Sequence, residues 1–254
     1  MARRWKMVLV VAAGLVCACA GQVEAHLRDY LVNEQYYTAK KSEFEVELHN
    51  DLHLSEADQT RSYSSEHQVE LEYGILDHLQ LAYYEVFGWE DARSGDRWDR
   101  EEFKLEAKLR FAEAGQWPAD VALYLEYASP DGPRDVSSDA IEGKVILSRD
   151  FGSWNLIGNF IFEREINVHE AWQLAYTAGI SYAVTPTTRL GLEVKESLGD
   201  EDEFDIFSAD REAYLVPGVY ITLTPHVRLL AGPAFGLTRS SDDLQVRTIV
   251  EVEF

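Results

Sequence analysis

Segments of about ten residues, in which apolar and polar side chains alternate, repeat along the chain from Glu43 to Phe254. The clearest begins at Glu102 and ends at Phe111, and it sorts its apolar side chains onto one face and its charged side chains onto the other. A helix would scatter those charges around its circumference, so a period of two predicts β-strands. Turn residues separate about twelve such segments.

The connections between these segments alternate in length. Short links at 74–78, 113–118, 151–153, 185–187 and 224–226 follow the even-numbered segments, whereas most links after the odd ones, such as 55–65 and 199–211, are longer and more polar. No apolar run after Ala20 is long enough to cross a bilayer as a helix. The pattern predicts an all-β fold, a transmembrane antiparallel up-and-down β-barrel of about 12 strands, with short periplasmic turns and longer outer loops.

The first 25 residues have the layout of an export signal. Arg3, Arg4 and Lys6 precede an apolar run from Met7 to Ala20, and small residues follow. We expect residues 1–25 to be a cleaved signal peptide, with cleavage after Ala20 as the alternative frame. Residues 26–42 are then a periplasmic N-terminal lead and 43–254 the outer-membrane barrel. Both cysteines lie in the signal peptide, which excludes a disulfide framework in the mature chain.

The chain ends on an aromatic residue. Val250, Val252 and Phe254 share the apolar face of the last segment, and a terminal aromatic on such a strand is typical of the assembly signal of bacterial outer-membrane proteins. The alternative is a soluble periplasmic barrel or sandwich, but twelve apolar strand faces would need a larger core than one domain of this size offers. Other aromatic residues near the expected strand ends suggest interfacial girdles, namely Tyr36, Tyr37, Tyr73, Trp89, Trp117, Trp154, Trp172, Tyr182 and Tyr214.

The formal net charge of −22 makes nucleic acid and anionic membrane surfaces poor partners. The partners that the barrel interpretation implies are outer-membrane lipid, lipopolysaccharide and the barrel-assembly machinery. The sequence carries no signal for an oligomeric state.

The polar strand faces should point into the lumen. This set is mostly acidic on the first two strands and mixed in sign on the fourth; the candidate lumen-lining residues are Glu43, Glu45, Glu47, Glu70, Glu72, Glu102, Lys104, Glu106, Lys108, Arg110, Glu193, Lys195, Arg228 and Arg247. One hypothesis is a passive channel or transporter for small solutes with an acidic polar lumen. The other is a structural or interaction barrel whose lumen is plugged by side chains that neutralise one another.

Three local patterns bear on whether the chain has a metal or catalytic site. His49 and His53 lie four residues apart on a strand, about 13 Å by strand rise, so they cannot share one metal without a bend. His53-Leu54-Ser55 has the His-x-Ser spacing of outer-membrane phospholipase A but lacks that family's Asn context. The acidic loop 199–205 lacks the glycine and terminal glutamate of an EF-hand. We therefore expect no enzyme, no catalytic residue, no metal ligand and no cofactor.

Two stretches resemble a known family. Residues 29–47, with Tyr36-Tyr37 and Lys41-Ser42, and residues 69–81, with the turn Gly74-Ile75-Leu76-Asp77-His78-Leu79, resemble the outer-membrane proteins grouped with the phenol-degradation MetA pathway. That family has Gly where this chain has Lys41-Ser42. The resemblance covers about the first third of the mature chain. It implies an outer-membrane barrel for small or hydrophobic substrates and supplies no catalytic residue.

Overall fold

The computed structural model describes residues 29–57, 60–90, 97–130, 138–166, 171–200 and 210–254. The sequence-based signal peptide, residues 1–25, lies outside this part of the chain. None of the described residues forms a helix long and apolar enough to cross a membrane. The strands are β1 (Phe44–Ala57), β2 (Thr60–Leu76), β3 (Leu79–Glu90), β4 (Arg97–Arg110), β5 (Asp120–Pro130), β6 (Ala140–Phe151), β7 (Trp154–Glu165), β8 (Gln173–Thr185), β9 (Thr188–Asp200), β10 (Ala213–Thr224), β11 (Val227–Gly236) and β12 (Leu244–Glu253).

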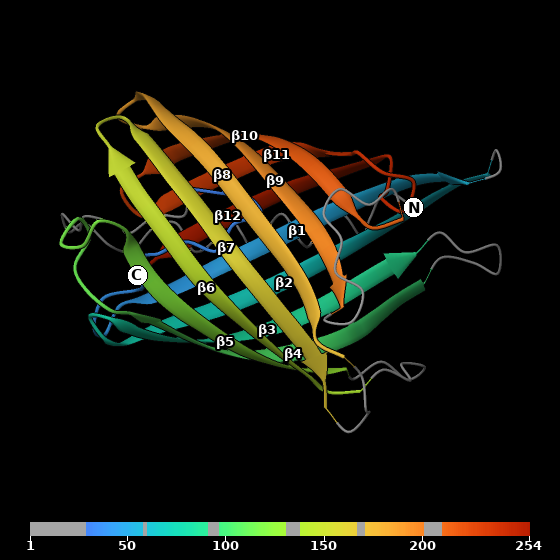
Figure 1. The fold of residues 1–254 in the computed structure, drawn as a ribbon, viewed down its shortest axis with the longest axis horizontal. Coiled ribbons are helices and arrows are strands. Elements are labelled where there is room, and N and C mark those ends of the chain that lie inside the picture. The colour runs from blue at the N-terminus through green and yellow to red at the C-terminus, as the bar shows by residue number, and fades with distance from the viewer. Residues whose placement is uncertain (1–28, 58–59, 91–96, 131–137, 167–170, 201–209) are drawn as a thin grey trace, which may run out of the picture.

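The twelve strands form one closed barrel (Figure 1). Each strand pairs antiparallel with its neighbours in sequence, and β1 pairs with β12 from Glu45–Glu253 to Leu54–Leu244. Closure pairs the backbone donors and acceptors that an open sheet would leave at its edges. The predicted up-and-down antiparallel barrel of about 12 strands is confirmed.

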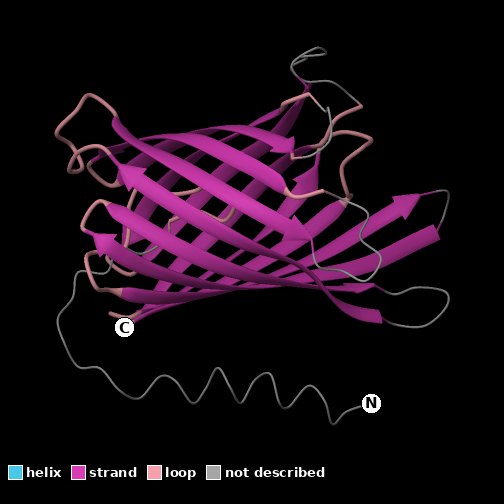
Figure 2. Cartoon of the chain, turned by 90° about the horizontal axis from the view of Figure 1, so that it is seen from below, coloured by secondary structure: helices cyan, strands magenta, loops and turns pink. Residues whose placement is uncertain are grey.

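The two ends of the barrel differ. The links 77–78, 111–119, 152–153, 186–187 and 225–226 lie at the end where β1 begins and β12 ends, which we call the turn end. The strand ends that the remaining links join lie at the opposite end, which we call the loop end (Figure 2). One loop-end boundary differs from the expected one. Pairing continues through Ser55–Ser62 to Ala57–Thr60, so most of the expected loop 55–65 is a strand hairpin.

The wall of the barrel is apolar outside and largely polar inside. Leu105, Leu125 and Phe160 are 49%, 55% and 59% exposed on the outer face. The alternate positions face inward, as Glu106 and Lys108 do beside Leu105. This inside-out distribution fits a wall surrounded by lipid, because so much exposed apolar surface is unfavourable in water.

The two prolines inside strands interrupt one seam. Pro217 lies in β10 and Pro233 in β11, and the pairing between these strands is interrupted between the pairs Leu215–Phe235 and Val219–Ala231. Proline cannot donate a backbone hydrogen bond. The flanking pairings of β10 with β9 and of β11 with β12 remain continuous through this stretch.

The segment before β1 lies inside the barrel. Residues 29–42, which we call the N-terminal segment and which we expected as a periplasmic lead, fold into the lumen at the turn end. Tyr30, Leu31, Asn33, Tyr36 and Thr38 are 0–2% exposed. They contact strands from several sides of the wall, so they fill the lumen rather than precede it.

Three residues of the stretches that resemble the MetA-pathway group, Gly74, Asp77 and Ser42, shape the contact between the N-terminal segment and the wall. A Cβ added to Gly74 would lie 1.8 Å from the backbone oxygen of Lys40, so this glycine lets the N-terminal segment pack against β2. Asp77 accepts a hydrogen bond from the Lys41 backbone N–H at 3.1 Å. Ser42 has a φ of 69°, a backbone conformation that favours glycine.

The last residue closes the barrel at the turn end. The Phe254 backbone N–H donates to the Phe44 oxygen at 2.9 Å, and the two rings lie 6.0 Å apart on the outer face. Val250 and Val252 occupy the outer positions of the same strand, because Ile249, Glu251 and Glu253 are buried inside.

We predict that Phe254→Asp lowers the fraction of folded barrel, because it removes the ring contact that joins the first and last strands and puts a charge beside lipid. Phe254→Tyr, which keeps the ring, is the control. The measurement is the fraction of the chain in the outer membrane that migrates as the compact form on unheated gels. Equal folded fractions for the Asp and Tyr variants would show that the terminal aromatic is incidental.

Candidate functional site

A cavity of about 630 Å³ occupies the lumen. Val32 and Glu34 of the N-terminal segment line it, as do loop-end residues such as Asp242 and Gln245. Nine carboxylate and four Lys or Arg side chains take part in its lining among the described residues. The cavity therefore has a polar wall with an excess of acidic groups.

The turn-end half of the lumen is filled. Gln80, Lys108, Glu193 and Tyr220 face inward and are 0–1% exposed. Side chains that line an open, water-filled passage keep part of their surface in solvent, and these do not. The N-terminal segment contacts these side chains, and the cavity lies on its loop-end side.

One carboxylate holds the N-terminal segment near its start. Oε1 of Glu193 accepts hydrogen bonds from the Leu31 backbone N–H at 2.7 Å and the Tyr220 hydroxyl at 2.8 Å. Oε2 accepts from the backbone N–H groups of Val32 and Asn33 and from Asn33 Nδ2, each at 2.9 Å. Charge-assisted hydrogen bonds of this kind are about twice as strong as neutral ones. Five donors also compensate for the cost of burying the carboxylate.

Apolar side chains inside the barrel form two patches for the same segment. Leu31 packs with Val216, Tyr220, Leu230 and Ile249 of β10–β12. The second patch lies across β5–β7, where the residues packed together are Tyr30, Tyr36, Ala122, Tyr124, Ile146 and Ile157, with Tyr37 beside them. Tyr36, Tyr37 and Tyr214 were expected in interfacial girdles and instead lie inside, because these patches bury them.

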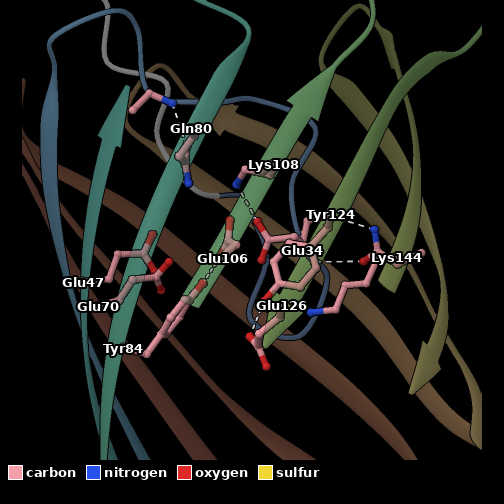
Figure 3. Close-up of polar contacts among 12 residues, drawn as sticks. Glu34, Glu47, Glu70, Gln80, Tyr84, Glu106, Lys108, Tyr124, Glu126 and Lys144 are labelled. Carbon is pink, nitrogen blue, oxygen red and sulfur yellow. Dashed lines mark hydrogen bonds and ion pairs between the residues drawn. The ribbon is translucent and has the colours of Figure 1, made fainter. Parts of the chain in front are cut away.

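Polar contacts also join the N-terminal segment to the barrel wall. The Lys108 ammonium lies 2.7 Å from Oε1 of Glu34 (Figure 3). Asn159 accepts from the Glu34 backbone N–H at 2.8 Å and donates to its oxygen at 2.9 Å. Thr177 donates to Asn33 Oδ1 at 2.8 Å, and the Tyr30 hydroxyl donates to Asn155 Oδ1 at 2.6 Å. The segment is thus bound to the wall through β4, β7, β8 and β9.

Buried glutamates line one side of the lumen, where β12, β1 and β2 meet. The register makes two adjacent rows, Glu253–Glu45–Glu72 and Glu251–Glu47–Glu70. All six are only 1–3% exposed, and we call them the acidic wall. Glu106 of β4 lies near this wall, and one of its oxygens accepts from Tyr84 (Figure 3). Its other oxygen, Oε1, is buried with no hydrogen-bond partner among the described residues.

The remaining sequence-predicted lumen residues lie either at the turn end or along the cavity. Glu43 lies at the turn end, where it accepts from the Lys40 backbone N–H, and Arg228 pairs with Asp29 at 2.7 Å. Arg110 donates to Thr38 and to the backbone oxygen of Asp77. Lys104, Lys195 and Arg247 line the cavity of about 630 Å³. Lys104 contacts Glu102 at 3.2 Å and Glu126 at 3.4 Å, and Arg247 donates two hydrogen bonds of 2.7 Å to Asp51. Glu102 and Lys104 also line a second cavity of about 190 Å³.

The two strand histidines have separate partners. His49 contacts Glu47 and Glu70, whereas Nδ1 of His53 lies 2.9 Å from Asp242. Ser55 also donates to Asp242, so the nucleophile candidate bonds the acid directly. Burial would raise the pKa of Asp242, but hydrogen bonds from Ser55, His53 and Gln245 lower it below its usual value. Nucleophilic catalysis requires a hydrogen bond between the nucleophile and its base. Among the described contacts, none joins Ser55 to His53.

Sequence reasoning missed the segment's own residues and its partners. Asn33, Glu34, Asn155, Asn159 and Thr177 have no charge pattern that marks them. The inward Leu230 and Ile249 are apolar on a face expected to be polar. The one local signal was the Gly74–Asp77 turn, which holds the segment at its end.

Comparison with known proteins supports the fold. No family model and no curated protein sequence matches this chain. An outer-membrane channel from Pseudomonas putida F1 is similar with a TM-score of 0.62 at 13% identity, covering 89% of this chain and 100% of that one. The KdgM porin (TM-score 0.54, 8% identity, 83% and 98% covered) and the NanC porin (0.56, 9%, 82% and 98%) are also similar. At these identities the likeness concerns the fold, and the grouping with the MetA pathway stays a prediction.

We predict that Glu193→Gln lowers the free energy needed to detach the N-terminal segment from the wall by about 2–4 kcal/mol. The reason is that an amide NH₂ replaces one acceptor oxygen and then faces hydrogen-bond donors. Chymotrypsin should then cut the refolded barrel faster after Tyr30, Leu31, Tyr36 or Tyr37. Glu163→Gln is the matched control, since Glu163 lines the cavity away from Glu193's partners. Equal cleavage rates in both variants and the wild type would mean that Glu193 does not hold the segment.

Proposed function

We propose that this chain is an outer-membrane channel for small solutes, partly closed from the turn end by its N-terminal segment. The observation that carries the proposal is the cavity of about 630 Å³ in a closed barrel, with a floor formed by a non-covalently held segment rather than by a strand. The structural likeness to an outer-membrane channel and two porins supports it. We place the turn end in the periplasm, as the export signal and the link lengths predict.

We further propose that the channel prefers cations or neutral solutes. Nine carboxylates against four Lys or Arg side chains line the cavity, and the acidic wall lies beside it. Fixed charge on a confined aqueous wall selects ions by direct Coulomb interaction. One KdgM porin structure is a complex with oligogalacturonate, an acidic sugar chain. The acidic lining proposed here as the selectivity element would repel such a solute.

A second candidate function, a structural or interaction barrel with a plugged lumen, is favoured by one observation. The inward side chains of the turn-end half are buried, as in a lumen filled by its own residues. The two proposals differ in whether the N-terminal segment lets small solutes pass through the lumen. Absence of any conductance from the refolded wild-type barrel would favour the plugged barrel.

We propose no enzymatic activity. His53 and Ser55 share Asp242 as a partner, and this contact uses the serine hydroxyl as a donor to the acid. Hydrolysis of micellar phospholipid by the purified barrel, lost in Ser55→Ala, would overturn this part of the proposal.

The selectivity test is conductance of the refolded barrel in planar bilayers. Potassium should be preferred over chloride, and the preference should weaken as the Debye length falls from about 10 Å at 0.1 M salt to about 3 Å at 1 M. The Glu66→Gln, Glu163→Gln double variant, which removes two cavity acids, should reduce the preference. Glu85→Gln, which removes an acid from the outer face, should not. Chloride selectivity in the wild type would contradict the proposal.

A further inference from the structure

We propose that Glu47, His49 and Glu70 form a binding site for a first-row divalent transition-metal ion, with Zn²⁺ as the probe. Glu47 and His49 lie two residues apart on the inner face of β1, and Glu70 lies directly opposite Glu47 on β2. One ligand atom from each residue lies within 4.8 Å of the other two. The proposal concerns bound metal and does not depend on whether the barrel conducts.

The geometry is close to what a metal ion requires. Nε2 of His49 lies 2.8 Å from Oε2 of Glu47 and 3.2 Å from Oε2 of Glu70. Nitrogen and oxygen ligands at about 2.0–2.2 Å from a tetrahedral Zn²⁺ are about 3.4 Å apart. Small side-chain rotations would open the triad to that spacing. A single imidazole with two carboxylates suits Zn²⁺ and its neighbours better than Ca²⁺ or Mg²⁺, which take oxygen ligands.

The electrostatic surroundings favour a cation at this place. Each of the three residues is 7% exposed or less, and Glu47 and Glu70 stand in one row of the acidic wall. The ion pairs of two nearby cations are made with other acids: Lys108 lies 2.7 Å from Glu34 and Arg247 lies 2.7 Å from Asp51. Neighbouring buried carboxylates repel one another strongly unless a positive charge lies among them.

Two more observations support a ligand here. Glu106 lies in the register row of Glu72, next to the row of Glu47 and Glu70. It is 4% exposed and keeps a carboxylate oxygen, Oε1, without a hydrogen-bond partner among the described residues. Figure 3 shows Glu47, Glu70 and Glu106 projecting into the lumen from β1, β2 and β4. His49 and Glu70 also line the cavity of about 630 Å³, which gives an ion and its remaining water ligands a path to the site.

The test is equilibrium dialysis of the refolded mature barrel, without a histidine tag, after removal of metal by a chelator. Bound zinc is counted by elemental mass spectrometry in the presence of excess Ca²⁺. We expect one Zn²⁺ per chain. His49→Gln, which keeps the size and polarity of the side chain, should lose it. Compact migration on unheated gels verifies that each variant is folded.

The matched control removes two acids of the neighbouring row, Glu45→Gln with Glu72→Gln, and should keep stoichiometric zinc. Equal loss in this control would mean diffuse attraction to the acidic wall and would overturn the site. Retention of zinc by the folded His49→Gln barrel would overturn it as well. Absence of stoichiometric zinc from the wild type would overturn it too. None of these results would affect the channel proposal, which conductance tests separately.

Discussion

Closure of the sheet is the constraint on which the rest of the structure depends. Because β1 pairs with β12, every strand turns one face to the outside and the other into a shared interior. The outside is apolar and needs no partner in lipid. The inside carries charged and hydrogen-bonding groups that must be satisfied by water, by one another or by another part of the chain. At the turn end the N-terminal segment satisfies these groups, and around the cavity charged side chains contact one another.

The N-terminal segment fills the turn-end part of the lumen and satisfies the polar groups there. It brings Leu31 to an apolar patch on β10–β12, Tyr30 and Tyr36 to another on β5–β7, and three backbone N–H groups to Glu193. Each contact is modest, but they come from opposite parts of the wall. Glycines make the approach possible, as a Cβ at Gly179 would lie 2.8 Å from the Tyr30 ring and one at Gly232 would lie 2.6 Å from Leu31. The wall and the segment are therefore shaped to each other.

Much of the fold could be predicted from the sequence, because strand periodicity and turn chemistry are local. The Glu102–Phe111 alternation and the tight links at 152–153 and 186–187 correspond to strands and turns of the structure. The position of the N-terminal segment could not be predicted, since its partners are remote: Leu31 meets Glu193 across 162 positions of the chain. The Glu47–His49–Glu70 triad was missed for a related reason. His49 and Glu70 are 21 positions apart in the chain, and only the β1–β2 register brings them together.

The central claim is that residues 29–40 close the turn-end half of the lumen. Single-channel conductance of a barrel that lacks residues 29–40 but keeps the signal peptide, compared with the wild type in the same salt, tests it most directly. The account predicts a clearly larger conductance for the truncated barrel, provided that it still migrates as the compact form on unheated gels. Equal conductance from the two folded barrels would contradict the account, because the segment could not then be what fills the passage.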